Sequence, residues 1–490
     1  MRTTAKIFAA TLLLASAASA LAAVHYVDVN GTNATPPYTN WSTAATNIQD
    51  AVDAAVAGDE IVVTNGTYHP VAANKPLNVR SVSGPQFTLI DGSGGNSRCV
   101  YLADAASLSG FTLANGFVEG ELYGGGAFGG TLNNCTLRNN RASYDVDTTG
   151  AKGGGAAYCT LNNCTLTGNS AIYPFYSFGA AYGGGAYQCT LNNCTLSGNR
   201  AENDCGGGFV DAPAYGGGAF ECILNNCVLT GNSVSGCHDS LGGGGLGGGA
   251  YNCTLNNCTL TGNSANRFGG GAYSGTLNNC IVYFNTNGGN YGGGLLTINY
   301  CCTTPLSTSG VGNITNAPLF VDTNAWSNLR LQSNSPCINA GNNSYVTNAT
   351  DLDGNPRIAG GTVDLGAYEF QAPASMISYA WLQRFNLPIN PATDTADPDG
   401  DGVNNYREWL AGSDPTNPFS FPPLLTLIPY GANIILTWPT NAVGFTLQST
   451  TNLSSPALWS TNSPGPIVIG GQNVVINPLS GPQQFFRLVQ

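Results

Sequence analysis

The chain carries acidic residues at the spacing of a calcium-binding loop. Asp397, Asp399 and Asp401 alternate with other residues, Gly402 follows them, and Glu408 ends the motif. Ca²⁺ prefers about six to eight oxygen ligands, which such a loop supplies from alternating positions and a final bidentate glutamate, with glycine at the sharp turn. The expected ligands are therefore the carboxylates of Asp397, Asp399, Asp401 and Glu408, the side chain of Asn405, and the backbone carbonyl of Val403. An acidic, solvated loop without an ion is the simpler alternative.

The predicted elements around this loop suggest a structural clamp rather than a sensor. A helix is expected over 406–411, directly after the last ligand, and one more candidate helix precedes the loop at 379–385. A single loop with little helical context has no second site with which to cooperate. We assign residues 376–418 to this calcium segment and expect calcium as the cofactor.

The composition limits what the remainder of the chain can be. Only 9% of the 490 residues are charged, with 15 Lys+Arg against 27 Asp+Glu, whereas roughly 25% is usual. A net charge of −12 argues against a nucleic-acid partner. The hydrophobic fraction of 42% is ordinary, which excludes disorder driven by charge. No apolar run after the N-terminus is long enough for a membrane span in the mature chain.

An internal repeat occupies the middle of the sequence. The string Leu-Asn-Asn-Cys recurs, with its leucines at positions 132, 161, 191, 224, 255 and 277. In most copies Gly-Gly-Gly-Ala and an aromatic residue precede it, and Thr-Leu-x-Gly-Asn follows it. Alternation at period two indicates short strands, while the Asn pairs and triple glycines indicate turns. One such unit cannot bury its own apolar side chains, so the units must stack.

The predicted fold class is all-β: a right-handed parallel β-helix over 23–370 with an N-terminal cap, then the calcium segment and a small β-sandwich over 420–490. In such a stack equivalent side chains lie about 4.8 Å apart, where like charges repel but amides hydrogen-bond. The expected amide column is Asn140, Asn169, Asn199, Asn232, Asn263 and Asn285, and the expected inward apolar column is Leu137, Leu166, Leu196, Leu229 and Leu260.

Ten of the 16 cysteines fall into two further columns. They either pack as small apolar side chains or form disulfides between neighbouring coils, because the coil spacing permits both. Cys205 and Cys237 lie outside these columns, at equivalent places in adjacent insertions, so we expect a disulfide between them. The columns are Cys135, Cys164, Cys194, Cys227, Cys258 and Cys280, and Cys159, Cys189, Cys222 and Cys253.

Four consecutive repeats carry longer insertions than the last two, and insertions at one repeat position map to one face. We therefore expect a loop face that binds carbohydrate or an extracellular partner, although its aromatic residues could instead pack against neighbouring loops. The candidate binding residues are Tyr144, Tyr173, Tyr176, Tyr215, Asp145 and Glu202. Asp204 and Asp211 are weak catalytic candidates, because no paired carboxylates occur in the coil strands.

Residues 1–22 have the pattern of a secretory signal peptide. Arg2 and Lys6 form its positive region, an apolar stretch follows, and small-x-small cleavage sequences end it. We therefore expect a secreted, extracellular or cell-surface protein of the cell envelope, acting as a monomer.

The repeats also carry a resemblance to known families. Over about 24–370 the chain resembles secreted bacterial right-handed β-helix proteins of the pectin-lyase-like class, with repeats similar to those of polymorphic outer-membrane proteins. The segment 351–370, DLDGNPRIAGGTVDLGAYEF, is similar to the end motif of choice-of-anchor Q surface proteins, and the calcium motif is similar to thrombospondin-type-3 or dockerin motifs. The sandwich over 420–490 resembles fibronectin-III or immunoglobulin modules only weakly. The resemblance implies a fold more than an activity.

Three functions stay open at this point. The first is a secreted or cell-surface β-helix, stabilised by calcium, that acts as an adhesin, carbohydrate-binding or structural surface protein. The second is a polysaccharide lyase or glycoside hydrolase working at the loop face. The third is a solenoid without a ligand. Whether the protein is an enzyme is therefore undecided.

Overall fold

The computed structural model describes residues 22–120, 123–143, 150–173, 179–203, 213–237, 243–420, 425–440, 445–453, 458–461, 465–478 and 483–489. The chain forms two compact units, one of 1–277 with 282–297 and the other of 278–281 with 298–490. In the described residues, no helix has the length and apolar character needed to cross a membrane.

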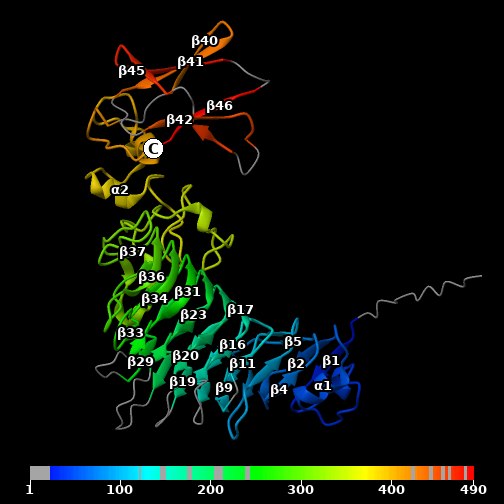
Figure 1. Ribbon diagram of the computed structural model, residues 1–490. Coiled ribbons are helices and arrows are strands. Elements are labelled where there is room, and N and C mark those ends of the chain that lie inside the picture. The colour runs from blue at the N-terminus through cyan, green and yellow to red at the C-terminus, as the bar shows by residue number, and fades with distance from the viewer. Residues whose placement is uncertain are drawn as a thin grey trace, which may run out of the picture. The chain divides into compact units, whose positions relative to one another are not determined.

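The first unit is a stack of short parallel strands (Figure 1), as the repeat predicts. Its largest sheet receives two strands from most coils, and these pair in register with the equivalent strands of the next coil, as Leu161 pairs with Leu191. This sheet contains β1 (Val24–Val27), β2 (Glu60–Val63), β4 (Val71–Ala73), β5 (Asn78–Ser81), β7 (Val100–Leu102), β8 (Ser107–Ser109), β11 (Ala127–Phe128), β12 (Thr131–Asn133), β16 (Ala156–Ala157), β17 (Thr160–Asn162), β21 (Ala186–Tyr187), β22 (Thr190–Asn192), β26 (Ala219–Phe220), β27 (Ile223–Asn225), β31 (Ala250–Asn256), β34 (Ala272–Asn278) and β36 (Tyr291–Asn299).

A second sheet follows each Asn-Asn turn, where the second asparagine has a positive φ, as at Asn193 (53°). It runs through β3 (Gly66–Tyr68), β6 (Thr88–Asp91), β9 (Thr112–Ala114), β13 (Thr136–Arg138), β18 (Thr165–Thr167), β23 (Thr195–Ser197), β28 (Val228–Thr230), β32 (Thr259–Thr261), β35 (Ile281–Val282) and β37 (Cys302–Thr303). A third sheet holds β10 (Phe117–Glu119), β14 (Arg141–Ser143), β19 (Ser170–Tyr173), β24 (Arg200–Asn203), β29 (Ser233–Ser235) and β33 (Ser264–Ala265), and a fourth holds β15 (Ala151–Lys152), β20 (Ala181–Tyr182), β25 (Ala214–Tyr215) and β30 (Gly245–Leu246).

The predicted amide column exists, and all of its members except the last, Asn285, are buried. The side-chain nitrogen of Asn199 donates to Asn232 Oδ1 at 2.9 Å, and Asn199 Oδ1 accepts from Asn169 at both the amide side chain (2.9 Å) and the backbone (3.0 Å). The triple glycine makes room for this column, because a Cβ on Gly185 would lie 3.1 Å from Asn199 Cγ and 2.6 Å from the Gly218 carbonyl oxygen. Two features of the repeat, Gly-Gly-Gly and the asparagine of Thr-Leu-x-Gly-Asn, are therefore explained by the same packing contact. The predicted leucine column is likewise fully buried.

The N-terminal cap is also present. Helix α1 (Ile48–Ala54) begins after Asn47, whose side chain accepts from the Asp50 N–H, and a short 3-10 turn (Trp41–Thr43) precedes it. Ile48, Ala51 and Val52 of the helix are buried. The cap therefore covers apolar side chains of the first coils.

The second unit begins with β37 (Cys302–Thr303), where the Cys302 N–H donates to the Cys280 carbonyl at 2.9 Å, followed by the antiparallel pair β38 (Phe320–Asp322) and β39 (Asn328–Leu331). The segment 351–370 closes on a buried ionic cluster. The Arg357 guanidinium, 1% exposed, donates to the carbonyls of Asp364 (3.1 Å) and Gly366 (2.6 Å) and lies 3.6 Å from Glu369. The charged residues of the end motif thus hold its own backbone in place.

Helices α2 (Tyr379–Arg384), α3 (Pro391–Thr395) and α4 (Asn405–Ala411) follow. The chain ends in two antiparallel sheets, of which one contains β40 (Thr426–Tyr430), β41 (Asn433–Pro439), β44 (Ile467–Ile469) and β45 (Gln472–Pro478), and the other β42 (Thr446–Thr450), β43 (Ser460–Thr461) and β46 (Phe485–Val489). Buried residues of both sheets, including Trp438 and Leu447, form one apolar cluster. The predicted fold class is confirmed: a mostly β chain with a parallel β-helix and small antiparallel C-terminal sheets.

Candidate functional site

The acidic loop of 397–408 brings its first three carboxylates together. One oxygen from each of Asp397, Asp399 and Asp401 lies within 4.8 Å of the other two. The loop's own backbone fixes this geometry: Asp397 accepts from the N–H groups of Gly400 and Gly402, both at 2.9 Å. Gly402 has a φ of 89°, which lets the chain turn where a side chain would be strained. The three residues form a candidate metal site.

The end of the motif adds buried oxygens that lack a hydrogen-bond donor. Glu408 is fully buried and Asn405 is 1% exposed, although both are polar. In the described residues no donor reaches Asp399 Oδ2, Asp401 Oδ2, Asn405 Oδ1 or Glu408 Oε2. Buried oxygens without a partner cost free energy, which a cation coordinated by them would offset. Four of the predicted ligand residues thus each have a side-chain oxygen that accepts no hydrogen bond and can coordinate an ion.

The electrostatics of the loop also favour a cation. Burial, together with the charges of Asp399, Asp401 and Asp397, raises the pKa of Glu408 to about 7. Burial and the nearby Asp401 likewise raise the pKa of Asp399, whereas the N–H of Gly402 lowers that of Asp397. No Lys or Arg in the described chain forms an ion pair with these carboxylates. An oxygen-binding cation would supply the missing positive charge.

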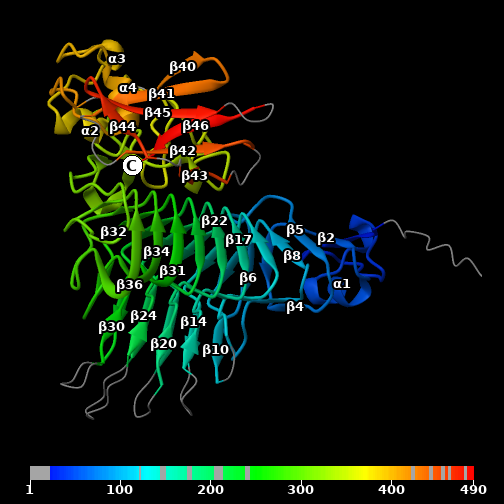
Figure 2. The ribbon, with the colours of Figure 1, turned by 45° about the horizontal axis from the view of Figure 1, so that its top comes forward.

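The predicted loop face can be followed only at its base. The strands that enter and leave the long insertions lie in adjacent coils: the third sheet leads into them and the fourth leads out (Figure 2). The insertions therefore start and end next to one another. The candidate residues Tyr144, Asp145, Tyr176, Asp204 and Asp211 lie outside the described residues, and their roles stay predictions.

Tyr173 needs a correction. It was expected to offer its ring to a ligand, but it is 1% exposed and belongs to an apolar cluster with Ala171, Ala181 and Ala201. A Cβ on Gly179 would lie 2.2 Å from the Tyr173 ring, so the glycine makes room for it. Tyr173 continues the inward alternation of β19, and it packs in the core rather than on a binding surface.

Glu202 and Tyr215, the other described binding candidates, are partly exposed. Glu202 forms an ion pair with Arg200 on the same strand. Tyr215 is partly buried and lies on a surface of stacked aromatic rings described below. Cys237 is disulfide-bonded, and Cys205, its predicted partner, lies outside the described residues. The column cysteines, in contrast, are free and buried, which contradicts the alternative of disulfides between coils.

Aromatic side chains from successive coils of the first unit form a continuous cluster, which we call the aromatic face. Its central rings, Tyr187 and Phe220, are buried, Tyr158 is exposed, and the other rings are partly buried. Rings at equivalent positions stack nearly parallel, with centroids 5.4 Å apart for Tyr187 and Phe220 and 5.3 Å for Phe220 and Tyr251. A second row stacks beside it, Tyr182 on Tyr215 at 5.4 Å. The face comprises Tyr123, Phe128, Tyr158, Tyr182, Tyr187, Tyr215, Phe220, Tyr251 and Tyr273.

Polar groups follow the same direction beside these rings. Gln188 Nε2 donates to Glu221 at 2.7 Å, and Asn252 Nδ2 lies 3.5 Å from the other Glu221 oxygen. The Lys152 ammonium lies 4.9 Å from the centre of the Tyr123 ring and within 5.8 Å of two further tyrosine rings. The aromatic residue after Gly-Gly-Gly-Ala was visible in the repeat, but its alignment into a surface was missed. The signal was an aromatic residue directly after Gly-Gly-Gly-Ala in five of the six repeats.

Comparisons with known proteins add little to this geometry. None of the known protein-family models matches the chain, and no curated protein matches it. Among solved structures, pectate lyase Pel9A has a TM-score of 0.41 at 15% identity, over 71% of this chain and 97% of its own. A rhamnogalacturonan lyase scores 0.29 at 13% identity (62% and 91% covered), and pectin methylesterase PemA from Erwinia chrysanthemi scores 0.28 at 11% (60% and 94%). At such scores these similarities assign neither activity nor substrate.

Proposed function

We propose that this protein is an exported, cell-surface or extracellular β-helix that binds carbohydrate on its aromatic face and is stabilised by calcium at the loop of 397–408. The aromatic face is the observation that supports this function best. Rings from successive coils, with tyrosine hydroxyls and amide groups beside them, form an amphipathic strip along the stack. Sugars present apolar C–H faces and polar hydroxyl edges, which such a strip can contact together.

The stacked rings and the ring of Tyr158 offer different contacts to a ligand. Rings that stack on one another use their faces for packing and leave edges and hydroxyls for other contacts, which suits hydrogen bonding to sugar hydroxyls. Tyr158 instead stands across the row, at 77° to Tyr187 and 62° to Phe128, and is 44% exposed. It is therefore the ring best placed to stack on a sugar. Tyr215, in the second row, is a predicted binding residue that also belongs to this face.

Calcium has a structural role in this proposal. The loop belongs to the second unit, whereas the aromatic face belongs to the first, so we assign the ion to the stability of the second unit. When bound, calcium would neutralise the clustered carboxylates and engage the unpartnered oxygens of Asn405 and Glu408. Calcium is abundant outside cells, so a site of modest affinity would be filled there.

Affinity electrophoresis of the full chain through gels containing neutral and acidic polysaccharides tests the proposal. Retardation by at least one polysaccharide is expected, and Tyr158→Ala and Tyr215→Ala should reduce it. Tyr430→Ala, at a tyrosine that is 66% exposed in the second unit, is the matched control and should change nothing. Retardation that is unaffected by both face variants, or absent for every polysaccharide, would refute carbohydrate binding here.

A catalytic function at the loop face is the alternative. The same preparations should be assayed for release of unsaturated or reducing sugars, with Asp204→Asn and Asp211→Asn as the variants. Turnover lost in these folded variants would replace the binding function by an enzymatic one.

A further inference from the structure

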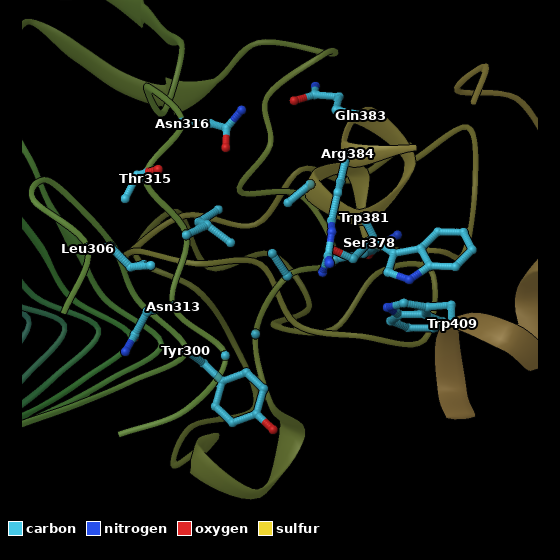
Figure 3. A pocket seen from close by; sticks show the side chains of 16 residues that line it. Tyr300, Leu306, Asn313, Thr315, Asn316, Ser378, Trp381, Gln383, Arg384 and Trp409 are labelled. Atoms are coloured by element: carbon cyan, nitrogen blue, oxygen red, sulfur yellow. The ribbon is translucent and has the colours of Figure 1, made fainter. Parts of the chain in front are cut away.

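The second unit contains a pocket that neither the calcium motif nor the aromatic face explains. It has a volume of 580 Å³ and is lined by residues of 300–316, 339–341, helix α2 and helix α4. Figure 3 shows Trp381, Arg384 and Trp409 on one side of it and Tyr300 and Leu306 on the other. A cavity of this size is in the range of sites for small molecules.

The lining combines aromatic rings with a single charge. Both indole rings and the Tyr300 ring are only partly buried, and Arg384 is the one charged residue among the lining residues. In the described chain no carboxylate pairs with this guanidinium, which lies 5.2 Å from the Phe385 ring. Neither indole N–H has an acceptor among the described residues. The pocket thus offers a cation, two free donors and apolar rings, in a protein of net charge −12.

These groups match one kind of ligand. An unpaired arginine prefers a planar or tetrahedral anion, to which it can donate more than one hydrogen bond. Tryptophan faces suit a ligand with an apolar C–H surface, and indole N–H groups suit its oxygen atoms. A neutral sugar would leave Arg384 without a partner, while a bare anion would leave the rings unused.

The pocket is also coupled to the metal loop through helix α4. Trp409 lines the pocket and follows Glu408, which ends the motif, so both side chains move with the same helix. Asn405, at the start of this helix, donates to the Thr393 carbonyl of α3 at 2.8 Å, and the Ser413 hydroxyl donates to Glu408 at 3.1 Å. Coordination of a cation by Asn405 and Glu408 would fix the position of α4, and with it one wall of the pocket.

We propose that this pocket binds a saccharide that carries one anionic group, a carboxylate or a sulfate, with Arg384 holding the anion and Trp381 and Trp409 holding the ring, and that calcium in the adjacent loop strengthens this binding. The ligand class follows from the proposed carbohydrate-binding function, but the residues are separate from the aromatic face.

Tryptophan fluorescence of the full chain, titrated with galacturonate, galactose 6-sulfate, galactose and acetate in the presence of Ca²⁺, tests the proposal. Galacturonate or galactose 6-sulfate should change the emission saturably, and the preferred one identifies the anion. Galactose should bind about tenfold or more weakly than the preferred anionic sugar. The Arg384→Gln variant should bind that anionic sugar about tenfold or more weakly than the unchanged protein does, since a hydrogen bond to a charged group contributes about 1.5–3 kcal/mol. Arg407→Gln, an exposed arginine of α4 outside the lining, should bind normally.

Each other outcome overturns a part of the proposal. Equal binding of galactose and galacturonate would refute the role of the anion, equal binding of acetate would refute the role of the sugar, and no saturable response would refute the site. Affinity unchanged by a chelator would refute the coupling to calcium. The Tyr215→Ala variant leaves the pocket intact. If this variant loses polysaccharide binding but keeps the fluorescence response, the aromatic face and the pocket are separate sites, and the failure of one can be told from the failure of the other.

Discussion

Replacing Asn199 by alanine tests whether the buried amide column holds the coils together. The Asn199 side chain takes part in hydrogen bonds to Asn232 Oδ1 and the Leu166 carbonyl, both at 2.9 Å, and accepts from two nitrogen atoms of Asn169. The residue is fully buried, so water cannot replace these partners. At about 1 kcal/mol for each of these hydrogen bonds, Asn199→Ala should lower the free energy of unfolding by about 4 kcal/mol.

The same coil supplies a matched control. Asn192 also forms a side-chain ladder, donating to Asn162 at 2.9 Å and accepting from Asn225 at 2.9 Å, but it is only partly buried. Water can satisfy its neighbours, so Asn192→Ala should cost less than about 1 kcal/mol. Asn199→Asp keeps the acceptor but turns the donor into an acceptor that faces Asn232 Oδ1, so it should be at least as destabilising as the alanine.

Equilibrium urea unfolding, followed by far-UV circular dichroism and checked for reversibility, measures these differences. Because a stacked-repeat protein is stabilised by contacts between neighbouring coils, the loss of stability measured at Asn199 should be similar for equivalent asparagines of the other coils. A loss in Asn199→Ala no larger than that in Asn192→Ala would refute the reasoning. Burial would then not be the property that makes this column important.

Three further predictions concern the second unit and the cysteines. EDTA should lower the melting temperature of the full chain in calorimetry, and Glu408→Gln should remove this effect if the ion binds in the acidic loop. Burial raises the pKa of Asp364 to about 7 and that of Glu369 to about 8. The stability that these two groups contribute is therefore complete below their ordinary pKa values and is lost as the pH rises through 7 to 8. The melting temperature should fall between pH 5 and pH 8.5, and an unchanged melting temperature would contradict this. Thiol titration should detect the 14 free cysteines of the described chain only after unfolding, and far fewer would indicate disulfides between coils.

The repeat allowed the columns to be predicted because its period fixes which residues are equivalent. The asparagine column from Asn140 to Asn263 and the leucine column from Leu137 to Leu260 could be predicted from the repeat alone, since parallel stacking brings equivalent residues together. The small antiparallel C-terminal sheets lie where a β-sandwich was expected, and helix α4 begins one residue before the expected start. The short helix α3 was missed, because it is too short to show a period.

The surfaces were harder to predict than the columns. Tyr173 was assigned to an exposed loop because insertion length shows where a loop occurs, but not how far the strand before it continues inward. The aromatic face required knowing that two rows, one from the repeat and one from the insertion ends, lie side by side, as the contact of Tyr182 with Phe220 at 4.9 Å shows. The pocket of the second unit joins residues more than 100 positions apart, from Tyr300 to Trp409, and no local pattern predicts such a meeting.

The state of the cysteines follows from the same stacking that explains the low charge. Each column thiol has a defined partner: the Cys135 N–H donates to Cys164 Sγ at 3.4 Å, and the Cys164 thiol donates to the Asn162 carbonyl at 3.3 Å. A column in which every thiol has equivalent neighbours above and below offers no unique pair. Among the described cysteines, Cys237, which lies outside the columns, is the one that forms a disulfide.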